Sequence, residues 1–180
     1  TWQVGALQKL ARPLADALSL NDNLLRLADI RKLDGLEARY IGLCMVAGLR
    51  GDVIDSAIVR QLNDSFNPKG SLQDFALLTA RYLFQCMRAL SLNEREIYDV
   101  FCGLDAFRRT DRCIEILQYF RQIQTAFGLG KTDAIEFLID CIPVLNTISA
   151  DEQIKSLSGE KIGEAIAQRR ISKIKELKAR

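Results

Sequence analysis

Clusters of arginine and lysine are the groups in this sequence best suited to bind a ligand. The first cluster lies in "LDAFRRTDR", where Arg108, Arg109 and Arg112 surround an expected helix start beside Phe107. Guanidinium groups on a helical frame next to an exposed aromatic ring can hold phosphates and stack on bases. The alternative is that Phe107 belongs to the core and the arginines are simply solvated. The sequence leaves both interpretations open.

The second cluster occupies the last 22 residues of the chain. Residues 159–180 hold seven Lys or Arg and three Glu, a net charge of +4, whereas the other 158 residues carry a net charge of −2. A basic tail on a mildly acidic body is a candidate contact for an anionic partner. Cations near the carboxyl end of a helix also interact favourably with its dipole, so a solvated helix end explains the same charges.

The sequence lacks the residues that common catalytic motifs require, and its one partial motif is not in the expected structural context. The chain contains no histidine, which excludes His-based triads, Cys-His pairs, HExxH zinc sites and His-Asp metal sites. Gly130, Lys131 and Thr132 match the end of a phosphate-binding P-loop, but Thr125 stands where its first glycine is needed. A helix is also expected before this segment, instead of the required strand. We therefore expect the chain alone to be non-catalytic.

The acidic residues and cysteines favour structural roles. Asp52 with Asp55, and Asp133 with Glu136, are expected in first helical turns, where the helix dipole favours negative charge. The five cysteines are odd in number, lack CxxC spacing and sit among apolar neighbours, which indicates reduced, buried thiols in a cytoplasmic protein. No apolar run approaches the ~20 residues of a membrane span, and no signal peptide is apparent. The start at Thr1 suggests a piece of a longer protein.

Apolar residues recur at steps of three and four nearly throughout, and strict alternation is missing, so the sequence predicts an all-α fold. The segment "LEARYIGLCMVAGL" is apolar on most sides and is expected near the centre. The break "NDSFNPKGS" is expected to separate a first helical lobe, 1–66, from a second, 67–180, within one continuous all-α unit. A helix is expected at 94–103, after a capping box of Asn93 with Glu96. Another is expected from Asp52, as its N-cap, to Leu62. A third is expected from Thr132 to a limit at Pro143.

Three stretches resemble, in order, the C-terminal half of the bacterial CCA-adding enzyme, a tRNA nucleotidyltransferase. "LEARYIGLCMVAG" is similar to its HD-motif helix, and "LDAFRRTDRCIEIL" to its Leu-Asp-Ala-Phe-Arg-Arg-Pro-x-Arg stretch. "SGEKIGEAIAQRRISKIKELK" resembles its closing helix and matches at Gly159, Ile162, Arg169, Arg170 and Ile171. The second and third stretches are the specific ones. The resemblance covers most of 20–178 and implies a multi-helix, HD-domain-like body with a C-terminal helical tail.

The resemblance also implies a function. In the family, the helical body and tail hold the acceptor arm and elbow of tRNA for a separate head, which adds C, C and A from CTP and ATP with Mg²⁺. The head motifs are missing here, so no cofactor is expected in this chain, although its full-length parent would be a nucleotidyltransferase. Where HD-bearing members have His-Asp, this chain has Met45 and Val46, and Asn21 falls at the first histidine position. These three residues cannot form a metal site.

The expected RNA contacts come chiefly from the closing helix, through Arg169, Arg170 and Lys173 with help from Lys161. Arg108, Arg109 and Arg112 are further candidates. One alternative is a protein-interaction module in which the apolar side of the last helix pairs with a second copy of the chain, through Ile162, Ile166, Ile174 and Leu177. Another is the C-terminal region of a related poly(A) polymerase.

Overall fold

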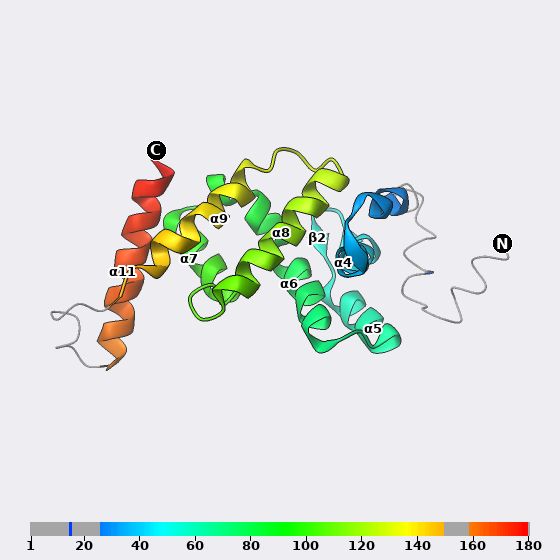
Figure 1. The fold of residues 1–180 in the computed structure, drawn as a ribbon, viewed down its shortest axis with the longest axis horizontal. Helices are drawn as coiled ribbons and strands as arrows, with labels where there is room; N and C mark the ends of the chain where they lie inside the picture. The colour runs from blue at the N-terminus through cyan, green and yellow to red at the C-terminus, as the bar shows by residue number, and fades with distance from the viewer. Residues whose placement is uncertain (1–14, 16–25, 150–158, 180) are drawn as a thin grey trace. The chain divides into compact units, whose positions relative to one another are not determined.

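The computed structural model describes Ala15 and residues 26–149 and 159–179 of the chain. In this part the protein is all-α with one small hairpin, which confirms the predicted fold class (Figure 1). The elements, in chain order, are η1 (Ala28–Lys32), α4 (Gly35–Gly48), β1 (Leu49–Arg50), β2 (Val53–Ile54), α5 (Ser56–Phe66), α6 (Gly70–Met87), η2 (Ala89–Ser91), α7 (Glu94–Gly103), α8 (Thr110–Ala126), α9 (Asp133–Asn146) and α11 (Gly159–Lys178). None of the described helices has the length and apolarity needed to cross a membrane.

The described residues divide into two compact units. The first takes those up to Phe84 together with Gln118–Thr132, and the second takes Gln85–Leu117 together with those from Asp133 onward. Each unit therefore draws on segments that are distant in sequence. The boundary expected between residues 66 and 67 falls inside the first unit, in the turn between α5 and α6.

Helix α4 supplies much of the core of the first unit. Its buried residues include Ile41, Cys44, Met45 and Val46, each at most 1% exposed, as its apolar character on most sides predicted. After α4 the chain turns back at once through an antiparallel hairpin that pairs Leu49 with Ile54. From Ile41 onward α4 therefore has little solvent-facing surface, whereas its first turn is exposed, with Leu36 at 78%.

The second unit places α11 against α7 and α9. Ile174, in the second half of α11, is fully buried, and the Lys178 ammonium at the end of the helix donates a hydrogen bond to the carbonyl of Leu92. The predicted capping box at the start of α7 is confirmed. The Asn93 side chain accepts from the amide of Glu96 at 2.9 Å, and the Glu96 carboxylate accepts from the amide of Asn93 at 2.8 Å.

Two predicted helix limits are wrong. Asp52 lies in the hairpin turn, and Asp55 instead caps α5 by accepting a hydrogen bond from the amide of Ala57 at 2.8 Å. Pro143 does not end α9, which continues to Asn146. The lost amide at Pro143 is tolerated because its side chain is exposed, while Ile142 and Leu145 on the same turn are buried in the core.

Four of the five cysteines are buried, as expected, whereas Cys102 on α7 is exposed. Burial raises the pKa of the Cys44, Cys113 and Cys141 thiols to about 12. It raises the pKa of the Cys86 thiol as well. Since the thiolate is the reactive form, these four thiols should be inert at neutral pH.

Alkylation at pH 8 should therefore modify one thiol per native chain. We expect iodoacetamide to label Cys102 alone in the native protein and all five cysteines in denaturant, as read by mass spectrometry of the intact chain and its peptides. The Cys102→Ser variant should remain unlabelled under native conditions. Rapid native labelling at any second cysteine would contradict the burial seen in the structure.

Candidate functional site

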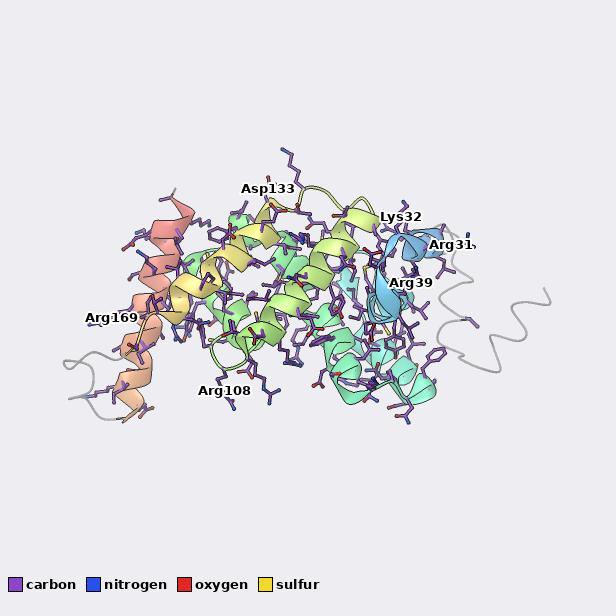
Figure 2. All side chains as sticks on the ribbon, viewed as in Figure 1. Arg31, Lys32, Arg39, Arg108, Asp133 and Arg169 are labelled. Carbon is purple, nitrogen blue, oxygen red and sulfur yellow. The ribbon has the colours of Figure 1, made fainter. Side chains whose placement is uncertain are left out.

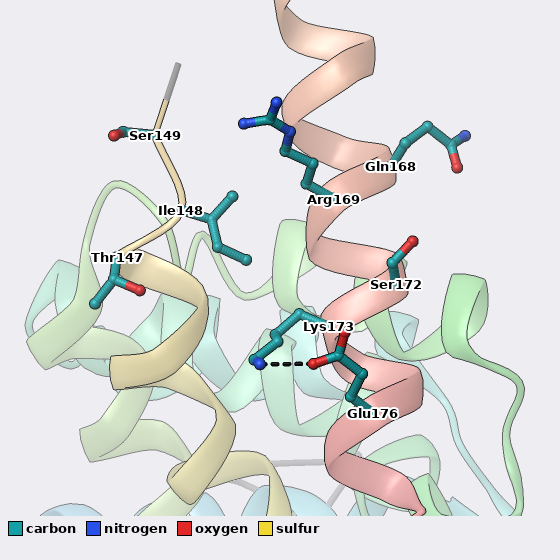
Figure 3. Close-up of a pocket in the computed structure, with 8 residues that line it drawn as sticks. All are labelled: Thr147, Ile148, Ser149, Gln168, Arg169, Ser172, Lys173 and Glu176. Atoms are coloured by element: carbon teal, nitrogen blue, oxygen red, sulfur yellow. Dashed lines mark hydrogen bonds and ion pairs between the residues drawn. The ribbon is translucent and has the colours of Figure 1, made fainter. Parts of the chain in front are cut away.

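An open groove of about 530 Å³ runs beside α11, opposite the residues that follow α9 (Figure 3). Its lining joins two segments of the second unit, Thr147, Ile148 and Ser149 on one side and Gln168, Arg169, Ser172, Lys173 and Glu176 of α11 on the other. Two of the residues predicted to contact RNA, Arg169 and Lys173, extend from α11 toward the 147–149 segment. The structure thus brings these two cations together at one surface.

The spacing of Arg169 and Lys173 explains why they share the groove. Residues four apart lie on the same flank of a helix, so both side chains project to one side. The Lys173 ammonium lies 2.6 Å from a carboxylate oxygen of Glu176, one turn further along the helix. The Lys173 side chain is 32% exposed and that of Glu176 60% exposed, so water weakens this ion pair. The groove therefore presents two cations and one carboxylate to a ligand.

Arg170 is placed differently from its neighbour Arg169. Its guanidinium carbon lies 3.7 Å from the centre of the Phe107 ring, close enough for a cation–π interaction. Its Nε atom donates to the carbonyl of Leu145 at 3.3 Å, and its Nη2 atom donates to the carbonyl of Ile148 at 3.4 Å. Arg170 therefore joins α11 to the end of α9 and to the turn before α8.

The Phe107 ring also contacts two aromatic residues of α7. It stacks on Tyr98, with ring centres 5.7 Å apart and planes 27° apart, and lies 6.2 Å from the ring of Phe101. Burial raises the pKa of the Tyr98 hydroxyl and a hydrogen bond with Cys102 adds to the shift, while Arg170 opposes it. We name Arg170, Phe107 and Tyr98 the arginine clamp. Because Phe107 belongs to this clamp, the structure favours a packing role for its ring.

The turn that carries Phe107 holds two more of the predicted RNA contacts. Asp105 has a left-handed backbone, with a φ of 57°. Its carboxylate lies 3.4 Å from the Nε atom of Arg109 and 4.0 Å from that of Arg108. Both arginine side chains are more than half exposed, and Figure 2 shows Arg108 on this turn and Arg169 on α11. This basic turn is a second cationic surface of the same unit.

The remaining predicted contacts are placed separately. Lys161 is exposed in the first turn of α11, and Arg112 is half-buried in the first turn of α8. Neither belongs to the described lining of the groove, and nor do Arg108 and Arg109. The structure therefore divides the seven predicted residues into a groove pair, a clamp residue, a basic turn and two residues that stand apart.

The sequence of this chain is similar to those of two curated proteins. The chain is 31% identical over 126 residues to the multifunctional CCA protein of Thioalkalivibrio sulfidiphilus (strain HL-EbGR7). The chain is related to multifunctional CCA proteins. The CCA protein of Hahella chejuensis (strain KCTC 2396) is a second relative, 26% identical over 129 residues.

The relationship to CCA proteins covers only part of their length. The two alignments include 68% and 67% of this chain but only 31% and 30% of the two CCA proteins. The chain thus spans about a third of the length of the curated relatives it matches. No protein-family model matches the chain, and no solved structure matches it.

Two positions that the resemblance to CCA-adding enzymes assigns to a lost metal site lie in the core of the first unit. Met45 is 1% exposed and Val46 is fully buried, both inside α4. The third position, Asn21, lies outside the described residues. Among the residues that are described, no group of three or more His, Cys, Asp or Glu is arranged to hold a metal ion.

Sequence reasoning missed two kinds of group in the groove and one at the end of α11. Glu176 could have been found from its spacing to Lys173, since residues three apart are neighbours on a helix. Thr147 and Ser149 line the groove through tertiary packing, which local spacing does not reveal. The role of Lys178, which anchors the end of α11 to Leu92, likewise depends on a contact 86 residues away.

Proposed function

We propose that this chain is the tRNA-binding body and tail region of a CCA-adding tRNA nucleotidyltransferase, acting with a catalytic head that lies outside it. The relationship to multifunctional CCA proteins supports the choice of enzyme. The observation that carries the binding role is the pair Arg169 and Lys173, which share one open groove on α11. Such a protein would act in the cytoplasm.

The proposed contacts are made to the RNA backbone. Arg169 and Lys173 would each hold a phosphate, and Lys161, Arg108 and Arg109 would provide further cationic contacts. Contacts of this kind position folded RNA and carry little base-sequence information, so binding should follow shape and salt concentration. The arginine clamp would contribute by fixing α11, which carries the groove residues.

The chemistry of nucleotide addition would belong entirely to the head. CTP, ATP and Mg²⁺ are therefore proposed as ligands of the head and not of this chain. The HD-like part of the body would be inactive, because the thioether of Met45 and the isopropyl group of Val46 supply no hard oxygen or imidazole ligand. The body would act on tRNA by binding alone.

The two alternatives find less support. Pairing of two chains through the last helix would need Ile174, but this residue is fully buried within its own unit, while Ile162, Ile166 and Leu177 are half-buried. The poly(A) polymerase alternative finds less support because both relatives are named multifunctional CCA proteins. These observations favour the tRNA-binding proposal.

The groove pair provides a direct test. The double variant Arg169→Ala/Lys173→Ala should bind labelled tRNA about tenfold more weakly than the parent chain in 100 mM salt. The slope of log affinity against log salt should also fall by about two, one for each lost phosphate contact. Fluorescence anisotropy across a salt series measures both quantities.

A charge-matched control separates a site from general attraction. Arg60→Ala/Lys69→Ala removes two exposed cations from the first unit and lowers the net charge equally. It should leave tRNA affinity within twofold of the parent. Equal losses in the two double variants would show that the groove is not the binding site.

A further inference from the structure

We infer that the α11 groove selects ribose-containing backbone over backbone that lacks the 2′-hydroxyl, and that Glu176 accepts a hydrogen bond from that hydroxyl. The inference rests on the proposed function and specifies the chemistry of the ligand. The observation behind it is a carboxylate placed among the cations that would hold phosphate.

A groove for phosphate alone would gain nothing from Glu176. The carboxylate repels an approaching anion and attracts the Lys173 ammonium, with which it forms the 2.6 Å ion pair. A carboxylate has two oxygens and about four acceptor positions, so it can receive a further hydrogen bond while it holds Lys173. Its 60% exposure leaves it accessible from solvent. The mixed lining therefore fits a ligand that offers a hydrogen-bond donor beside its negative charge.

The spacing along α11 points to a repeating ligand. Arg169 and Glu176 are seven residues apart, a rise of about 10.5 Å along the helix, with Lys173 between them. The three charged groups together span more of the helix than a single phosphate occupies. A sugar–phosphate chain carries phosphates with hydroxyls between them. Arg169 and Lys173 would contact the phosphates, and Glu176 would contact a hydroxyl.

Double-stranded RNA displays such groups on an accessible surface. Its wide, shallow minor groove exposes 2′-hydroxyls next to backbone phosphates, and proteins bind it mainly through these two groups. Thr147, Ser149 and Ser172 also line the groove, and these small polar residues suit a sugar–phosphate chain better than an apolar ligand. The open form of the site also suits a polymer lying along it better than a small molecule, which is normally enclosed.

Arg170 removes an electrostatic obstacle at the groove. The carboxyl end of α9 carries partial negative charge, which would disfavour an anion beside residues 147–149. Arg170 donates hydrogen bonds to the carbonyls of Leu145 and Ile148 at that end, and its positive charge offsets the helix dipole there. The groove is thereby suited to hold a phosphate next to a helix terminus that would otherwise repel it.

The test compares backbones of the same shape. The full chain is titrated with a labelled RNA hairpin and with the same sequence in 2′-fluoro form, which keeps the A-form helix but has no 2′-hydroxyl donor. We expect the parent chain to bind the RNA about tenfold more tightly, the effect of a hydrogen bond to a charged acceptor. The Glu176→Ala variant should bind both hairpins with affinities within twofold of each other.

The ratio of the two affinities is the decisive quantity, because removing any carboxylate from α11 strengthens the binding of all anions. Glu164→Ala is the matched control, since Glu164 is an exposed residue of α11 outside the described lining of the groove. It should keep the tenfold preference for RNA. If Glu176→Ala also keeps this preference, the 2′-hydroxyl is contacted elsewhere and the inference is wrong.

The remaining outcomes separate the inference from the proposed function. Equal binding of both hairpins by the parent chain, with weaker binding by Arg169→Ala/Lys173→Ala, overturns the inference and supports the phosphate-binding role of the groove. Absence of binding to either hairpin and to tRNA overturns both.

Discussion

Replacing Arg170 with alanine is expected to lower the free energy of unfolding by about 3 kcal/mol, whereas Arg169→Ala should change it by less than about 0.5 kcal/mol. Arg170 would lose a cation–π contact with Phe107 and leave the carbonyls of Leu145 and Ile148 without these donors. Arg169 is exposed in the groove, where its alanine variant should instead weaken RNA binding. The two adjacent arginines are thus expected to differ, with Arg170 supporting stability and Arg169 supporting the proposed RNA binding.

Urea unfolding followed by far-UV circular dichroism measures the stability effect. A double-mutant cycle with Phe107→Leu isolates the contact between the two side chains, and its coupling energy should be about 1 kcal/mol. Arg170→Lys keeps the charge but not the planar donor arrangement, so it should recover only part of the loss. If Arg169→Ala and Arg170→Ala had equal stability, the arginine clamp would not support α11.

The Val46→Asp substitution is expected to lower the free energy of unfolding by about 4 kcal/mol or more, because it places a carboxylate in the apolar core. Val46 is fully buried in α4, as is Ala47 after it, and Met45 before it is 1% exposed. A typical domain is stable by only about 5–15 kcal/mol, so this change should unfold much of the first unit. The position that the resemblance to CCA-adding enzymes aligns with the HD aspartate is part of the core in this chain.

Val53→Asp is the matched control, with the same chemical change at a residue of β2 that is 64% exposed. This variant should lower the free energy of unfolding by no more than about 1 kcal/mol. Thermal unfolding and limited proteolysis of the two variants provide the comparison. Native-like stability of Val46→Asp would mean that this part of α4 can open to water, and would reopen the question of a metal site there.

Local signals in the sequence were enough to predict most of the helices. The period of apolar residues identified α4 as a buried helix, and Asn93 with Glu96 marked the start of α7 correctly. The errors arose where tertiary packing outweighs local preference. Asp52 has the chemistry of an N-cap but lies in a two-stranded hairpin, and Pro143 remains inside α9.

The candidate site could be predicted only in part for a similar reason. The four-residue spacing of Arg169 and Lys173 places them on one helix flank, and this follows from the sequence alone. The different role of Arg170 does not follow, although its side chain points about 100° away from that of Arg169. It depends on a contact with Phe107, 63 residues earlier, and on carbonyls at the end of α9.

The left-handed backbone of Asp105 limits what the stretch "LDAF" can reveal about any protein that contains it. This conformation costs most side chains about 1–2 kcal/mol and is tolerated by Asp, Asn and Gly. Ala106 is fully buried, so a larger side chain would not fit there, and Phe107 must be aromatic to stack on Tyr98 and Arg170. Backbone geometry and packing alone therefore account for the motif. A chain could lose every contact with RNA and keep these four residues, so the motif alone is evidence of a shape and not of a ligand.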